Sequence, residues 1–328
     1  MSKRNITKLL GKIFVLAISI LLLILIISFG DLDAMYSHLR TISVVDILIL
    51  IMILNVSLLL RVWRWKVLLA DEVKAPFLRL VPVFLLGKAI TGFTPGNVGD
   101  PLRSVILKKS EGIPVSKSIK SILVERVADL MTVIFFSLYV LLFYFQNDGI
   151  KVWIGYASLV VTIGMTLLFC FSKHFSSFIL HRLARLFNKS GKIKGLIDSF
   201  IDSFCDSTIK KRTLLVALVV SVLIWTLDGF VFFYVLKSLM VGINFLYFLS
   251  AFALSVIFGL ITLLPGGLGA LDGGLVFLLI NVGVDKNVAI TGVLIGRFVT
   301  YAYPMVLGYL SFLALRVMEK KDLSNKTT

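Results

Sequence analysis

Long hydrophobic runs separated by short polar stretches dominate the chain. Six of these runs are nearly free of charge and close to the ~20 residues that cross a bilayer core. They are residues 13–29, 44–60, 130–145, 152–171, 214–236 and 245–264. A soluble domain has no means of hiding six such segments. The pattern therefore predicts an all-α polytopic membrane protein with roughly seven to nine hydrophobic segments, the first of them a retained anchor.

Two further apolar segments are broken by proline and glycine. Residues 78–93 include Lys88 and run into Pro95, Gly96 and Gly99. The second break has the same character, with Pro265, Gly266, Gly267 and Gly269. Such clusters cannot continue a helix. We expect residues 78–107 to enter the membrane, turn back at the break and return to the same side, and we expect the second region to turn similarly before crossing to residue 316.

The two broken regions are related in sequence. Both contain the motif PGxxG, at residues 95–99 and 265–269, and both continue to a glycine followed 14 residues later by an arginine in an apolar helix. The offsets between the copies are 170 and 171 residues. Threading the chain by its basic loops brings the first copy in from the inside and the second from the outside. We therefore expect one transmembrane domain, residues 1–328, with inverted repeats at about 78–145 and 245–316, an architecture common among transporters.

The net charge of +16 follows topology and gives no indication of a nucleic-acid partner. Of the 34 lysines and arginines, 26 lie in five stretches: the N-terminus, residues 61–79, 108–120 and 173–212, and the C-terminus from residue 316. This alternation obeys the positive-inside rule and predicts cytoplasmic termini in a cell membrane. We expect the Trp- and Arg-rich residues 61–66 in the headgroup layer. Residues 173–212 are predicted to form amphipathic helices on the inner surface, or alternatively a small soluble helical hairpin.

Charged residues inside the membrane are the candidate binding residues, because they must pair, face a cavity or carry function. They are Lys88, Asp100, Arg103, Glu125, Arg126, Asp129, Asp272 and Arg297. Two interpretations stay open, internal ion pairs and contact with a ligand. For Arg126 and Arg297 we favour ligand contact, because their equivalence across the repeat presents two guanidinium groups suited to a phosphate. Asp228 lies alone in its segment and is either a helix–helix hydrogen-bonding residue or a proton-coupling site.

No pattern supports a metal, a cofactor or a catalytic centre. The two cysteines, Cys170 and Cys205, are far apart, and the three histidines lie at segment edges. GxSxG, HExxH and Walker motifs are missing from the sequence, which argues against common hydrolases and against a primary ATPase. We expect no cofactor and no metal, and we assign no catalytic residue.

These motifs, in this order, resemble a flippase-like transmembrane family that includes the membrane half of lysylphosphatidylglycerol synthases. The resemblance covers about residues 10–316 and rests on PxxxGDxxR from Pro95, ERxxD from Glu125, LPGGLG from Leu264 with Asp272 after it, and Arg297. Two positions depart from the family pattern. The family often has a basic residue between Pro95 and Gly99, and it usually has a glutamate where this chain has Asp272.

The resemblance implies that the protein moves phospholipid-type molecules between leaflets, such as aminoacylated phosphatidylglycerol or another lipid-linked phosphate. The alternatives are a membrane enzyme of lipid modification, such as a phosphatidylglycerol lysyltransferase, and a transporter of a soluble anion. We expect the soluble lysyl-transferring domain of the full synthases to be absent. Expected partners are membrane lipids and a separately encoded lipid-modifying enzyme, with a homo-oligomer also open.

Overall fold

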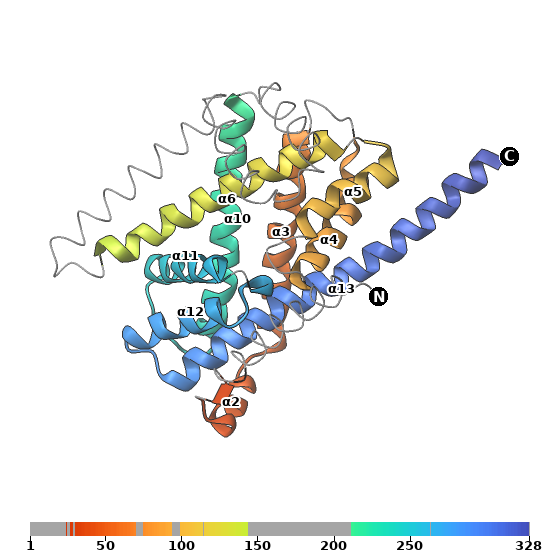
Figure 1. The fold of residues 1–328 in the computed structure, drawn as a ribbon. Coiled ribbons are helices and arrows are strands. Elements are labelled where there is room, and N and C mark those ends of the chain that lie inside the picture. The colour runs from red at the N-terminus through yellow and green to blue at the C-terminus, as the bar shows by residue number, and fades with distance from the viewer. Residues whose placement is uncertain are drawn as a thin grey trace, which may run out of the picture.

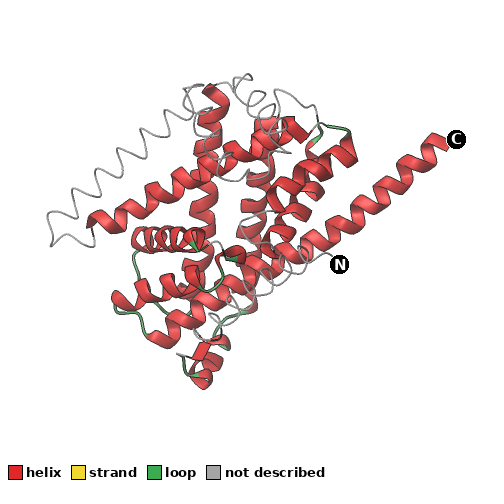
Figure 2. Ribbon diagram, in the orientation of Figure 1, coloured by secondary structure: helices red, strands yellow, loops and turns green. Residues whose placement is uncertain are grey.

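The computed structural model describes residues 30–69, 75–93, 99–113, 115–143, 211–262 and 264–327, together with Ile24, Ile27 and Ser28. Within these ranges every regular element is helical (Figures 1 and 2). The elements are α2 (Leu32–Leu39), α3 (Val44–Leu69), α4 (Phe77–Phe93), α5 (Gly99–Glu111), α6 (Val115–Phe143), α10 (Lys211–Ser238), α11 (Phe245–Ile261), a 3-10 turn (Pro265–Gly267), α12 (Ala270–Asn281) and α13 (Lys286–Thr327). The protein is thus an all-α polytopic membrane protein, as the hydrophobic pattern predicted.

Three described helices are long and apolar enough to cross a bilayer, in Val44–Leu69, Arg212–Ser238 and Lys286–Val317. Their outer faces carry exposed apolar side chains at helical spacing. On α3 this face consists of Leu48, Met52, Val56, Leu59 and Trp63. The polar and charged residues Ser57, Arg61 and Arg64 of the same helix are buried instead. A helix that is apolar outside and polar inside is suited to lipid and not to water.

The first expected break separates two helices that fold back on one another. A Cβ atom added at Gly99 of α5 would lie 2.3 Å from the backbone nitrogen of Thr91 in α4, and one at Gly87 of α4 would overlap Arg103 of α5. Positions later in α5 thus contact positions earlier in α4, so the helices are antiparallel. Gly99 is required here because any side chain would push the two helices apart.

The second break has the same geometry. Gly259 of α11 lies against Leu271 of α12, and Gly274 of α12 lies against Phe258 of α11. Between these helices the backbone takes left-handed angles at three glycines, Gly266, Gly267 and Gly269, with φ from +58° to +83°. Only glycine adopts such angles readily, so the PGGLG sequence produces this turn directly.

The two hairpins exchange partners across the molecule. The α4–α5 hairpin and α6 belong to the first half of the chain, yet α4 packs along α13 of the second half. In the same way α11 packs along α6. Helices α3 and α10 contact each other between the hairpins, so that α4 and α5 lie to one side of this pair and α11 and α12 to the other (Figure 1).

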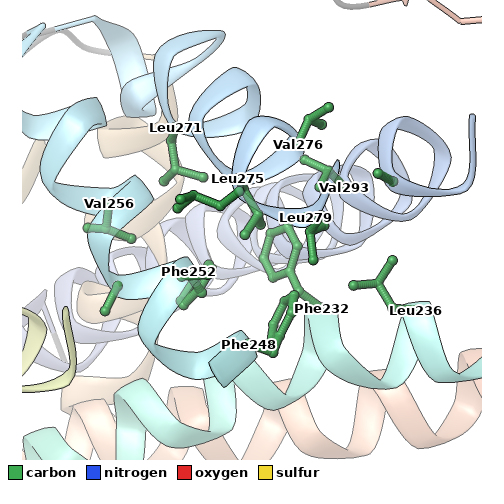
Figure 3. Close-up of a cluster of buried hydrophobic side chains, with 14 of the residues drawn as sticks. Phe232, Leu236, Phe248, Phe252, Val256, Leu271, Leu275, Val276, Leu279 and Val293 are labelled. Carbon is green, nitrogen blue, oxygen red and sulfur yellow. The ribbon is translucent and has the colours of Figure 1, made fainter. Parts of the chain in front are cut away.

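The second hairpin is held by an apolar core. Phe232 and Leu236 of α10 meet Phe248 and Phe252 of α11, and Leu275 of α12 completes the cluster (Figure 3). Phe248 and Leu275 are fully buried. This packing fixes α11 and α12 against α10 and α13 without any charge.

Several predicted segments lie outside the described residues. They are the first hydrophobic run up to Leu23, the end of the 130–145 run, the 152–171 run and the amphipathic stretch 173–212 up to residue 210. The central residues of the first break, 94–98, also fall outside them. Those predictions therefore remain predictions.

Candidate functional site

A cavity of about 560 Å³ lies between the two hairpins. Its walls come from α3, α4, α6, α10, α11, α12, α13 and the turn at Gly266. Much of the lining is aliphatic or aromatic, but six charged residues also line it: Arg61, Lys88, Arg126, Asp129, Asp228 and Arg297. Ligand sites combine apolar walls with a few convergent polar groups in this way. Four of the six residues are cations.

Three arginines and three acids form a closed ring of ion pairs beside the cavity. The ring runs Arg64, Glu125, Arg103, Asp100, Arg126, Asp129 and back to Arg64. Its members come from α3, α5 and α6, so it ties the first hairpin to both long helices. Because each charge lies between two of opposite sign, the ring as a whole is neutral.

Arg64 is a buried member of this ring and contacts two of its acids. Its Nη1 donates to Asp129 Oδ1 at 2.6 Å and its Nη2 lies 3.5 Å from Glu125 Oε1. Nη1 also bonds Ser221 Oγ on α10. The repulsion expected between Glu125 and Asp129, four residues apart on α6, is thus relieved by a cation from another helix.

Both arginines of residues 61–66 point into the protein, so neither is free to extend into the headgroup layer as expected. Arg64 is 1% exposed and Arg61 is 6% exposed, and Trp65 is fully buried with its Nε1 donating to Ser121 Oγ. Only Trp63 of the tryptophans in this stretch faces outward. The reason is that carboxylates on α6 and α10 offer pairing inside the protein, which outweighs snorkelling to the interface.

Arg103 lies against α4 at Gly87, where the missing side chain makes room for it. Its Nη2 donates to Glu125 Oε2 at 2.7 Å, and its guanidinium stacks over Phe84 and Trp65. Such stacking suits the planar, weakly hydrated guanidinium group. Arg103 does not line the cavity, so its role is to hold the first hairpin in place.

Arg126 belongs both to the ring and to the cavity wall. Its Nη1 lies 3.4 Å from Asp100 Oδ2 and its Nη2 lies 3.1 Å from Asp129 Oδ2. Asp129 lies three residues after Arg126 on α6, a spacing at which helix side chains meet. Its side chain is nevertheless 38% exposed, far more than the other ring arginines.

Arg297 is the corresponding residue of the second half. Its Nε pairs with Asp272 and its Nη2 donates to the carbonyl of Gly266 at 3.2 Å. Tyr301, one turn later on α13, donates to the same carbonyl at 2.6 Å. Asp272 also accepts from the backbone N–H of Gly269 at 2.9 Å. These contacts fix the glycine turn, and the short Asp272 side chain suits this reach back to the start of α12.

Asp228 is a helix–helix contact. One carboxylate oxygen accepts from Ser57 of α3 at 2.6 Å and the other pairs with Arg61 of α3. The hydrogen-bonding role that the sequence left open is therefore present in the structure. This pair joins the first half of the chain to the second at the cavity wall.

Lys88 completes the set of cavity charges. It lies on α4 and is partly buried. No carboxylate among the described residues forms an ion pair with it. The described part of the chain also holds no group of His, Cys, Asp and Glu suited to a metal ion.

The structure thus brings Asp100, Arg103, Glu125, Arg126 and Asp129 into one network and keeps Arg297 with Asp272 in another. Of the residues at the breaks, Pro265, Gly266, Gly267 and Gly269 lie in the second turn, and Gly99 begins α5 at its close contact with α4. Pro95 and Gly96 lie outside the described residues. The sequence analysis missed Arg61 and Arg64 as interior residues. Their i, i+3 spacing on the face opposite Leu59 and Trp63 was the available signal.

The family model for the lysylphosphatidylglycerol synthase transmembrane region matches residues 12–308. A UPF0104 membrane protein of Pyrococcus horikoshii is 24% identical over 318 residues, covering 90% of this chain and 95% of that protein. A UPF0104 membrane protein of Methanocaldococcus jannaschii is 27% identical, covering 98% of this chain and 99% of that protein. One from Methanothermobacter thermautotrophicus is 23% identical, covering 85% and 87%.

Proposed function

The chain belongs to the family of the lysylphosphatidylglycerol synthase transmembrane region, and from that premise we propose that it moves phospholipid-type molecules between the leaflets of a cell membrane. The headgroup would occupy the cavity between the two hairpins while the acyl chains stay in lipid. Phosphatidylglycerol and related anionic lipid phosphates are the proposed substrates. Lysyl-phosphatidylglycerol, whose two ammonium groups make its headgroup cationic, is the alternative that the assay below compares with them. No catalytic residue and no cofactor enter the mechanism.

The observation that carries this proposal is the character of the cavity. It lies within a helical membrane protein, it has apolar walls, and cations predominate among the charged residues that line it. Its volume of about 560 Å³ falls within the ~300–1,000 Å³ of typical ligand pockets. An amphipathic anion matches both features, because its phosphate can meet the cations and its glycerol region can meet the apolar wall.

One side of the cavity has exposed apolar side chains at its wall. Leu130 of α6 is 47% exposed and Leu260 of α11 is 42% exposed, and both line the cavity. A lipid whose headgroup enters between α6 and α11 would leave its acyl chains beside these residues. This arrangement favours a lipid substrate over a soluble anion.

The inverted repeat provides the proposed route to alternating access. In the repeat, α4 corresponds to α11, α5 to α12 and α6 to α13. The contact of α4 with α13 then corresponds to that of α11 with α6, and the contact of α5 with α6 corresponds to that of α12 with α13. These reciprocal contacts support the repeat predicted at about residues 78–145 and 245–316. Rocking of one repeat against the other would expose the cavity to each leaflet in turn. We also propose cytoplasmic termini, on the basis of the positive-inside pattern.

The test is lipid translocation in proteoliposomes that contain fluorescent phosphatidylglycerol or lysyl-phosphatidylglycerol, read by quenching of the outer leaflet. A cavity-filling variant, Leu130→Trp, is compared with Phe135→Trp, which enlarges a 57% exposed side chain on the same helix outside the cavity. We expect transport by wild type and by Phe135→Trp and a strong reduction in Leu130→Trp. Wild-type protein that moves no lipid above protein-free vesicles would refute the proposal.

A further inference from the structure

Lys88 differs from every other cation at the cavity in forming no ion pair with a carboxylate of the described residues. The carboxylates that attract it, Asp100 and Asp228, are each already paired with an arginine. Arg61 pairs with Asp228, and Arg297 pairs with Asp272. Arg126 lies within the neutral ring, between Asp100 and Asp129. Among the residues that the structure describes, the charges that line the cavity and the charges paired with them therefore balance except for Lys88.

An uncompensated ammonium group at this site requires explanation. Lys88 is partly buried on a helix of the first hairpin, in a protein whose surroundings are lipid. Removing a charge from water without a partner has a large free-energy cost. The three donors of a lysine ammonium are well suited to the oxygens of a phosphate, which it binds as a point charge. The missing partner is thus explained if the ligand supplies it.

Resting on the proposed function, we propose that Lys88 binds the phosphate of the transported lipid and that the cavity selects a phosphodiester headgroup with a net charge of −1. A single negative charge neutralises the single excess cation. Arg126 and Arg297, which the sequence favoured as the phosphate ligands, are committed to Asp100, Asp129 and Asp272. They position the hairpins around the cavity.

The lipid arm of the experiment compares phosphatidylglycerol, whose headgroup has a net charge of −1, with phosphatidylethanolamine, whose phosphodiester charge is balanced by its own ammonium group, in the same vesicles. The variants are Lys88→Met, which removes the charge, and Lys88→Arg, which keeps it. Lys108→Met serves as the matched control, because Lys108 is an exposed lysine on the same hairpin and lies outside the cavity. Loss of one charge-assisted hydrogen bond predicts a fall of about tenfold or more in phosphatidylglycerol transport.

We expect Lys88→Met to lower the ratio of phosphatidylglycerol to phosphatidylethanolamine transport, with Lys88→Arg close to wild type and Lys108→Met unchanged. Lys88→Met should also be at least as stable as wild type to heat, because it removes an unpaired charge. An unchanged lipid ratio in Lys88→Met would overturn the inference while leaving lipid transport intact. A loss of stability in Lys88→Met would likewise overturn it, because it would reveal a structural partner.

A second arm separates this inference from the proposed function. Binding of soluble glycerophosphoglycerol and of inorganic phosphate to the full-length protein in detergent is measured by calorimetry. If wild type moves no lipid but binds either anion through Lys88, the phosphate site stands and the source of the phosphate is soluble. If wild type neither moves lipid nor binds either anion, the inference fails together with the function.

Discussion

Arg64→Met is the substitution that tests most directly whether the ring of ion pairs holds the first hairpin. Methionine has a similar length and is apolar, so the change removes the charge without leaving a large void. It leaves Glu125 and Asp129 buried, with Glu125 0% and Asp129 4% exposed. Each acid then keeps one arginine, Arg103 or Arg126.

The contacts in the structure set the expected magnitude. Breaking a buried pair by removing one partner typically costs about 3–5 kcal/mol. Arg64 contacts both carboxylates, with its shortest bond at 2.6 Å, but neither acid is left without a cation. We therefore expect a loss of about 3 kcal/mol in the free energy of unfolding, at the lower end of that range.

The assay is denaturant unfolding of purified protein in detergent, followed by tryptophan fluorescence. Arg79→Met is the matched control, because Arg79 forms an ion pair with Glu111 at 3.2 Å but its side chain is 55% exposed. An exposed pair of this kind contributes about 0–1 kcal/mol. The same substitution is thus made in two ion pairs that differ chiefly in how deeply they are buried.

A double variant tests the ring as a unit. Arg64→Met combined with Asp129→Asn restores the balance of charges. We therefore expect the double variant to lose about 1–2 kcal/mol less in the free energy of unfolding than the sum of the two single variants. If Arg64→Met destabilises the protein no more than Arg79→Met does, the ring carries no stability. Strict additivity of Arg64→Met and Asp129→Asn would also contradict the reasoning.

Two further substitutions test the contacts between the halves of the chain. A Cβ at Gly308 of α13 would lie 2.3 Å from the Cβ of Ala89 in α4, so Gly308→Leu should separate these helices and destabilise the protein by about 1–3 kcal/mol or more in the same unfolding assay. Asp228→Asn leaves Arg61 without its counter-charge and should shift lipid preference in the translocation assay towards a doubly charged phosphate monoester such as phosphatidic acid. A preference equal to that of wild type would contradict this expectation.

The sequence predicted most of what depends on local chemistry. Hydrophobic length located α3, α10 and α11, and the proline–glycine clusters located the turns of both hairpins. The turn at residues 265–269 follows from its glycines, because left-handed backbone angles are strained for other residues. The pairing of Arg126 with Asp129 followed from helical spacing.

What the sequence did not predict depends on which helices meet. Arg64 pairs with Asp129, 65 residues later, and Arg61 pairs with Asp228, 167 residues later. Helical periodicity places these arginines on the inner face of α3, but it cannot identify the helix that faces them. Because tryptophan and arginine often gather at the headgroup layer, the sequence favoured an interfacial position for these side chains. The contacts of α3 with α6 and α10 place the two arginines inside the protein instead.

The position of these two arginines decides the class of ligand. With Arg61 and Arg64 at the interface, the interior network would contain the acids Asp100, Glu125, Asp129, Asp228 and Asp272 against only Lys88, Arg103, Arg126 and Arg297. Acids would then be in excess, and a cationic ligand would fit best. With both arginines inside, as the structure has them, cations exceed acids by one in the described part of this network. Where water is excluded, a ligand whose charge is opposite to the net charge of the network is favoured. Placing Arg61 and Arg64 in the interior and not at the interface therefore changes the expected ligand from a cation to an anion.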